Sequence, residues 1–144
     1  MNIQEFSDKF NAMLDIQLSK DVEEISPHLY NAKAPEGAEI VSMAIKPGVF
    51  EEGKDIGIRP ITEEEYNEVV ITEEYIRVES HGYTFRYRAP NGKVFTVRGL
   101  FDVLLKIEKY SRPKTDWFGG IDVHHIFFEG FYFKNGVYHC YWGS

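Results

Sequence analysis

The sequence has one cysteine, Cys140, so the chain cannot form an internal disulfide and is not a disulfide-stapled mini-protein. No apolar run approaches the ~20 residues that a membrane helix needs, and the first ten residues carry acids and no apolar stretch. We therefore expect neither a membrane span nor a signal peptide, and a cytoplasmic protein. Three common enzyme signatures, the P-loop, G-x-S-x-G and G-x-G-x-x-G, are also missing, which removes the commonest hydrolase and nucleotide-enzyme classes.

The 144 residues are enough for one ordinary domain, and we expect a single domain over residues 1–144. The net charge of −7 is unevenly distributed. Residues 1–80 hold 18 acidic and 7 basic side chains, whereas residues 81–144 hold 5 acidic and 9 basic ones. An acidic chain is a poor ligand for long duplex DNA, but a locally positive region can hold a small anion.

Two amphipathic helices are predicted. Apolar residues recur at steps of three and four over residues 3–19, and again over 97–111 after the capping residue Thr96. Pro113 ends the second helix. A third, short helix is expected after Thr62, because three glutamates follow this capping residue.

The remaining patterns predict strands. Residues 39–45 are apolar and partly β-branched, and Pro47-Gly48 is expected to end that strand. Alternation over 74–80 and 83–88, with turns at His81-Gly82 and Pro90-Asn91-Gly92, predicts an antiparallel meander whose third strand is 93–96. Strands over 123–128 and 131–142 follow, the latter folded about Asn135-Gly136. The expected fold class is α+β, with helices packed on an antiparallel sheet.

The strand YTFRYR, residues 83–88, is the first candidate site. One face carries rings and the other carries Arg86 and Arg88. The rings either belong to the core or stack a nucleotide base while a guanidinium grips phosphate. Arg112 is the second candidate: it either pairs with Glu108 four residues earlier or contributes to an anion pocket near Trp117.

The segment WFGGIDVHHIFFEG, residues 117–130, is the third candidate. On a strand, Asp122 and His124 share one face and His125 points to the other. An Asp-x-His pair can act as a general base or as part of a metal site, for which the third ligand would have to be Glu129, His139 or His81. The spacing matches no metal motif, so we expect no metal and no cofactor. Alternatively, one histidine is buried and hydrogen-bonded and the other lies on the surface.

Aromatic residues make up 15% of the chain, which is high for a domain of this size. They crowd the C-terminal hairpin, where rings occur on both faces. A sheet with two apolar faces needs cover on both sides, so the pattern favours a homo-oligomer.

The segment FTVRGLFDVLLKIEKYSRPKTDWFGGIDVHHIFFEG, residues 95–130, together with the terminal YWGS, resembles the small phage proteins of the Thoeris anti-defence family. The resemblance implies an oligomeric, non-enzymatic protein that pairs an antiparallel sheet with helices. It also implies sequestration of cyclic ADP-ribose-type signals, and in some members of cyclic oligonucleotides, which blinds a bacterial immune system. By this resemblance Phe85 stacks a base, while Arg112 and Arg59 hold the pyrophosphate.

Residues and resemblance together predict a phage or prophage protein, acting in the host cytoplasm, that captures a nucleotide-derived signal without converting it. Phe85 would stack the adenine, Arg112 with Arg88 or Arg59 would hold phosphate, and His124 or His125 would donate a hydrogen bond. Two alternatives remain open. The acidic half could cover a protein partner, as an inhibitor or immunity protein does, or Asp122, His124 and Glu129 could form a small hydrolase.

Overall fold

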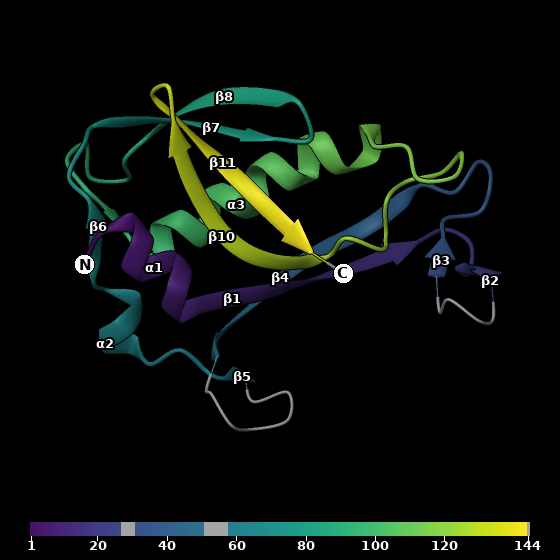
Figure 1. Cartoon of the computed structure of the whole chain (residues 1–144), viewed down its shortest axis with the longest axis horizontal. Helices are drawn as coiled ribbons and strands as arrows, with labels where there is room; N and C mark the ends of the chain where they lie inside the picture. The colour runs from purple at the N-terminus through teal and green to yellow at the C-terminus, as the bar shows by residue number, and fades with distance from the viewer. Residues whose placement is uncertain (27–30, 51–57, 144) are drawn as a thin grey trace.

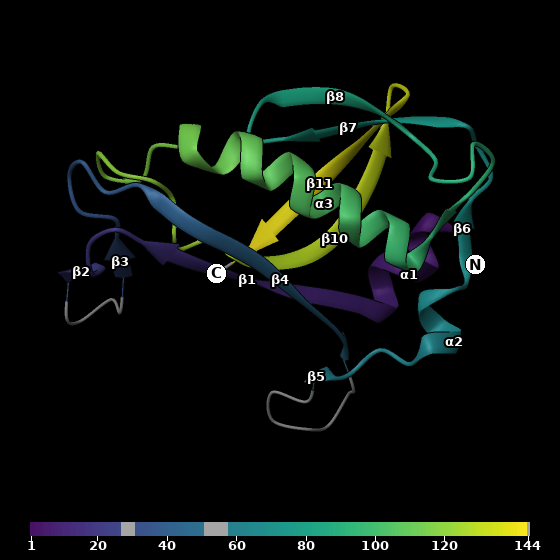
Figure 2. The same ribbon diagram turned by 180° about the vertical axis from the view of Figure 1, so that it is seen from behind.

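Figures 1 and 2 show the computed structural model, which describes residues 1–26, 31–50 and 58–143. Its main element is a seven-stranded sheet with the order β5-β4-β1-β10-β11-β7-β8. In chain order these strands are β1 (Phe10–Leu18), β4 (Ile40–Phe50), β5 (Ile58–Arg59), β7 (Tyr75–Ser80), β8 (Tyr83–Arg88), β10 (Phe127–Lys134) and β11 (Val137–Gly143). Two small sheets pair β2 (Glu23–Ser26) with β3 (Asn31–Lys33), and β6 (Val69–Ile71) with β9 (Phe95–Thr96).

Helix α3 (Val97–Ser111) confirms the helix predicted over 97–111. The hydroxyl of Thr96 accepts a hydrogen bond from the backbone N–H of Gly99, which satisfies one free donor of the first turn. The 3-10 turn η1 (Arg112–Lys114) follows directly. Figure 1 shows β10 and β11 in front of α3, and Figure 2 shows α3 in front of them. The face of β10, β11, β7 and β8 that points away from α3 is called the outer face below, and the opposite face is called the inner face.

The predicted helix over 3–19 is wrong beyond its first two turns. Helix α1 (Ile3–Lys9) begins at a capping box between Asn2 and Glu5, and β1 starts at Phe10. Phe10, Ala12 and Leu14 are buried at a spacing of two, which a strand requires. The apolar residues of this segment fit the period of a helix as well as that of a strand. The segment is a strand because it pairs along its whole length with β4.

Strand β4 runs through Pro47, so the prediction that Pro47-Gly48 ends the strand is also wrong. Pro47 pairs in register with Ala12 of β1, whereas β5 pairs only with Val49 and Phe50. Within the described residues, β4 therefore has an unpaired side at Pro47. Proline is tolerated there because a strand edge loses no ladder hydrogen bond.

The hairpin of β7 and β8 confirms two predicted strands and their turn, in which His81 and Gly82 both have positive φ. The prediction that residues 93–96 form the third strand of the meander is wrong. The side chain of Asn91 accepts hydrogen bonds from the N–H groups of Lys93 and Val94, so the chain turns away from β8. β9 pairs with β6 instead, and β7 pairs in parallel with β11. The sheet is therefore not purely antiparallel.

The C-terminal hairpin of β10 and β11 turns at Asn135-Gly136, as predicted. The strand expected over 123–128 begins only at Phe127. The fold is α+β, as expected, and consists mostly of sheet. None of the helices in the described ranges is long and apolar enough to cross a bilayer.

The core lies between the inner face of the sheet and the helices. Phe6 of α1 packs against Phe101 of α3 and Phe131 of β10, with ring centroids 5.4 and 5.9 Å away. Short α2 (Glu63–Tyr66) begins after Thr62, as predicted, at a second capping box. Apolar burial of this kind is the main stabilising contribution to the fold.

Candidate functional site

Arg112 lies inside the protein, with no exposed surface. Its Nε donates to Oε2 of Glu108 at 2.9 Å, and its Nη1 donates to the backbone carbonyl of Asp122 at 3.2 Å. The guanidinium carbon lies 4.9 Å from the centre of the Trp142 ring. A phosphate could reach Arg112 only by displacing these groups, so the geometry favours the ion-pair alternative over a ligand contact.

Glu108 has further partners. The hydroxyl of Ser80 donates to Oε1 at 2.7 Å, and Nε2 of His81 lies 3.1 Å from Oε2. Ser80 and Glu108 are completely buried. The carboxylate thus joins α3 to the turn between β7 and β8, and its charge is balanced inside the protein by Arg112.

Arg59 and Arg88 lie on opposite edge strands of the sheet, β5 and β8, which Figure 1 shows far apart. Arg59 makes two hydrogen bonds to Glu65, at 2.7 and 2.9 Å. Nε of Arg88 lies 3.5 Å from Oε1 of Glu74. The structure therefore does not bring Arg59 together with Arg88, and each has a carboxylate partner of its own.

Phe85 is half-buried on the inner face of β8. Its ring centroid lies 4.7 Å from that of Tyr110 on α3, in an edge-to-face contact. The aromatic face of YTFRYR therefore packs toward the helix, and Arg86 and Arg88 point to the outer face. This arrangement matches the core alternative for these rings.

Asp122, His124 and His125 lie in an irregular loop, so the prediction that they belong to a strand is wrong. Oδ1 of Asp122 accepts hydrogen bonds from the backbone N–H groups of His124 and His125, at 2.9 and 3.0 Å. Its Oδ2 lies 2.8 Å from Nδ1 of His125, so the side-chain partner of Asp122 is His125 and not His124. His124 instead stacks flat on Trp117, with centroids 5.1 Å apart.

Burial raises the pKa of Asp122, but the hydrogen bonds from His125 and His124 outweigh it and lower that pKa overall. Glu129 is exposed on β10, at the register shift between Phe128 and Gly130. Within the described residues, no group of three or more His, Cys, Asp or Glu side chains could hold a metal ion.

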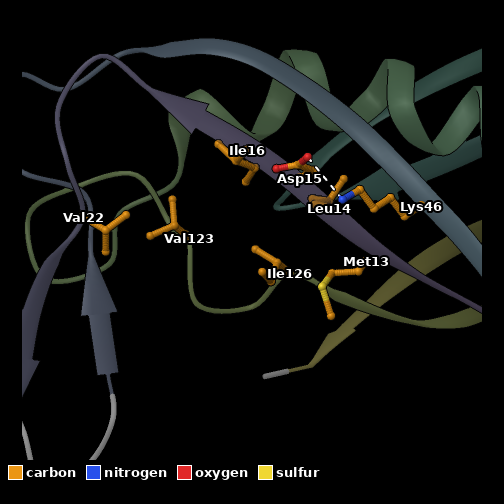
Figure 3. A pocket seen from close by; sticks show the side chains of 8 residues that line it. All are labelled: Met13, Leu14, Asp15, Ile16, Val22, Lys46, Val123 and Ile126. Carbon is orange, nitrogen blue, oxygen red and sulfur yellow. Dashed lines mark ion pairs between the residues drawn. The ribbon is translucent and has the colours of Figure 1, made fainter. Parts of the chain in front are cut away.

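An apolar pocket of about 380 Å³ lies between β1 and the loop before β10 (Figure 3). Met13 and Ile16 approach Val123 and Ile126 across it, with Val22 at one end. The one cation drawn there, Lys46, is paired with Asp15 at 3.5 Å. This pocket suits an apolar group and offers little to an anion.

A second pocket of about 300 Å³ has a different character and is called the arginine pocket below. Its lining residues come from β7, β8 and the β10–β11 hairpin: Glu73, Tyr75, Ile76, Arg77, Arg86, Phe133, Gly136 and Tyr138. β11 and β7 pair only at Tyr138 with Val78 and at His139 with Glu79. The strands are unpaired before these positions, and the pocket lies at that gap.

The two arginines of this pocket face each other. Arg77 and Arg86 are direct partners across β7 and β8, on the outer face. The guanidinium of Arg86 lies 3.8 Å from the centre of the Tyr75 ring. In the part of the chain that the structure describes, neither arginine forms an ion pair with a carboxylate. Like charges directly opposite each other on a sheet are destabilising.

Sequence reasoning singled out Arg86 but missed Arg77 and Tyr75. The alternation of Tyr75, Arg77 and Glu79 is visible in the sequence, and it places Arg77 on one face. The missing information was the register across the His81-Gly82 turn, which sets Arg77 opposite Arg86. Counting outward from that two-residue turn would have found the pair.

Comparisons with protein-family models, with curated proteins and with solved structures found no match. The candidate site therefore stands on geometry alone, and the arginine pocket is the strongest candidate for binding a ligand.

We expect Glu108→Gln to lower the free energy of unfolding by about 3 kcal/mol, because it leaves the buried charge of Arg112 without its counter-ion. The double variant Glu108→Gln/Arg112→Met should recover most of that loss, since it removes both charges. Urea unfolding followed by circular dichroism measures both. If Glu108→Gln lowers the free energy of unfolding by well under 1 kcal/mol, a structural role for the Glu108–Arg112 ion pair is contradicted.

The carboxylate of Glu65 makes the stability of the protein depend on pH. Its hydrogen bonds to Arg59 lower its pKa far below the usual 4.5, burial opposes this, and Thr62 and Lys9 add to the lowering. Because the folded pKa is below the unfolded one, the stabilisation is complete above pH 4.5 and is lost progressively at lower pH. Glu65→Gln should therefore lower the urea midpoint at pH 7 and flatten its decline between pH 5 and pH 3, as a midpoint series will test. An unchanged slope would contradict this assignment.

Proposed function

We propose that this protein binds a small, nucleotide-class anion in the arginine pocket without converting it. The observation that carries the proposal is the direct opposition of Arg77 and Arg86. Like charges on residues paired across two strands repel each other, and a phosphate bound between the two arginine side chains replaces that repulsion with charge-assisted hydrogen bonds. Guanidinium groups are also the best match among side chains for phosphate oxygens.

The walls of the arginine pocket support a nucleotide over a bare anion. At one side the exposed ring of Phe133 packs on the buried Tyr138, with centroids 4.6 Å apart, and at the other the exposed Tyr75 lies under Arg86. Exposed rings such as Phe133 can stack a base. Burial raises the pKa of Tyr138, and the charge of Glu73 raises it further, so the Glu73 carboxylate lies near that ring. A carboxylate there can accept a hydrogen bond from a ribose hydroxyl or a base amino group.

Binding without conversion fits the chemistry of the described lining residues. They include no serine, cysteine or histidine, so they supply none of the commonest nucleophiles and no imidazole base. Capture of a signalling nucleotide of the cyclic ADP-ribose type, as the family resemblance implies, requires only a preorganised pocket. The proposed role is therefore sequestration, at residues other than Phe85 and Arg112.

Arg77→Thr tests the proposal. We expect it to weaken nucleotide binding about 10- to 100-fold, the loss of one charged hydrogen-bond donor to phosphate. The same variant should be slightly more stable than the parent without ligand, because it removes the repulsion with Arg86. Titration calorimetry with AMP, ADP and cyclic ADP-ribose measures the first effect, and thermal melting measures the second.

Arg98→Gln is the matched control. Like Arg77, Arg98 is an exposed arginine, but it is paired with Glu63 and lies 4.5 Å from the Tyr66 ring. Its replacement should leave binding unchanged. Equal affinity of the Arg77→Thr and Arg98→Gln variants, or no binding of any of these nucleotides to the parent, would refute the proposal. Mass spectrometry of the released ligand distinguishes sequestration from turnover.

A further inference from the structure

The outer face carries exposed rings beyond the arginine pocket. Tyr132 of β10 is 49% exposed and Tyr141 of β11 is 56% exposed. The Tyr132 ring stacks on His139 of β11, with centroids 4.7 Å apart and planes inclined by 12°. Nδ1 of His139 lies 3.1 Å from Oε2 of Glu79, so the imidazole is held in place from β7. The two rings form a fixed stack, called the platform below, in which His139 covers one face of Tyr132 and Tyr132 remains half exposed.

Strand register places this platform beside the cations. Tyr132 pairs with His139, His139 with Glu79, and Glu79 with Thr84, which forms one row across β10, β11, β7 and β8. Two residues further along, on the same face, come Lys134 on β10 and the facing pair Arg77 and Arg86. Two residues of a strand span about 7 Å, so the ring row and the cation row are neighbours.

Charge complementarity indicates what covers this face. In the described part of the chain, Arg77, Arg86 and Lys134 form no ion pair, whereas Glu79 is paired with His139 and Glu74 with Arg88. Glu73, which lines the arginine pocket, also has no ion pair there. The face therefore combines exposed rings with three cations that have no ion pair among the described residues. Single-stranded nucleic acids are bound by this combination, in which cations contact the backbone and rings stack successive bases.

We propose that the outer face of β10, β11, β7 and β8 binds a short single-stranded oligonucleotide. One nucleotide occupies the arginine pocket, and a neighbouring base stacks on the platform of Tyr132 and His139. This inference rests on the proposed function and extends it from one nucleotide to several. A duplex is excluded from this mode, because its bases are stacked on one another and cannot lie on the rings.

Fluorescence anisotropy with end-labelled oligo(dT) and oligo(U) of two, four and eight nucleotides tests the inference, with the parent and the variants Tyr132→Ala, Tyr132→Phe and Phe118→Ala. We expect the eight-nucleotide strands to bind at least tenfold more tightly than a mononucleotide. Tyr132→Ala should weaken their binding about tenfold and leave mononucleotide binding unchanged, because it removes one stacking surface. Tyr132→Phe, which keeps the ring, should restore affinity.

Phe118→Ala is the control, because Phe118 is a 60% exposed ring in the loop after η1, outside the four strands of the outer face. The Phe118→Ala variant should bind the oligonucleotides with the same affinity as the parent protein. Affinity should also fall with salt, in proportion to the phosphates contacted.

Equal affinity for one and eight nucleotides, equal binding of the matching duplex, or no effect of Tyr132→Ala would overturn the oligonucleotide inference. If Arg77→Thr still weakens mononucleotide binding in those cases, the proposed function stands by itself. If oligonucleotides bind and neither variant weakens them, both proposals fail. Binding of an acidic peptide such as oligo(Glu) with the same affinity and the same dependence on Tyr132 would also overturn the inference, because it would show charge attraction without base stacking.

Discussion

The buried ion pair between Glu108 and Arg112 connects α3 to the sheet and to the loop before β10. It lies at the C-terminal end of α3, and its partners come from three other places: Ser80 at the end of β7 and His81 in the turn after it, Trp142 on β11, and the backbone of the loop at Asp122. Removing two charges from water is costly unless each is balanced and hydrogen-bonded. Helix, sheet and loop together supply the partners of this pair, and within the described residues only Nη2 of Arg112 is left buried without a hydrogen-bond partner among them.

The arginines of the chain fall into two groups, those with a carboxylate partner and those without one among the described residues. Arg112, Arg59, Arg98 and Arg88 each have a carboxylate partner and contribute to holding elements together. Arg77 and Arg86 are paired across β7 and β8 on the outer face, a position in which like charges are generally destabilising. A costly arrangement of this kind is typical of functional sites, where stability is exchanged for binding. The same division explains why a ligand site is proposed at the outer face and not at the end of α3.

Local patterns predicted the elements whose signals lie within a few residues. Thr96 and the apolar stripe predicted α3, and His81-Gly82 and Asn135-Gly136 predicted both hairpins. The errors arose where long-range pairing decides. Residues 10–18 fit a helix or a strand until β4 pairs with them, and Pro47 is tolerated because its side of β4 lacks a neighbour among the described residues. The burial of Arg112 depends on tertiary packing that spacing does not encode, whereas the pairing of Arg77 with Arg86 follows from the register of the His81-Gly82 turn.

The central claim is that the anion-binding arginines are Arg77 and Arg86, and that Arg112 belongs to the core. Nitrogen-15 NMR of the arginine Nε–Hε groups during titration with AMP tests it most directly, because each guanidinium reports its own environment. The account predicts that the Arg77 and Arg86 resonances shift with AMP concentration while that of Arg112 stays fixed. A shift of the Arg112 resonance with Arg77 and Arg86 unmoved would contradict it.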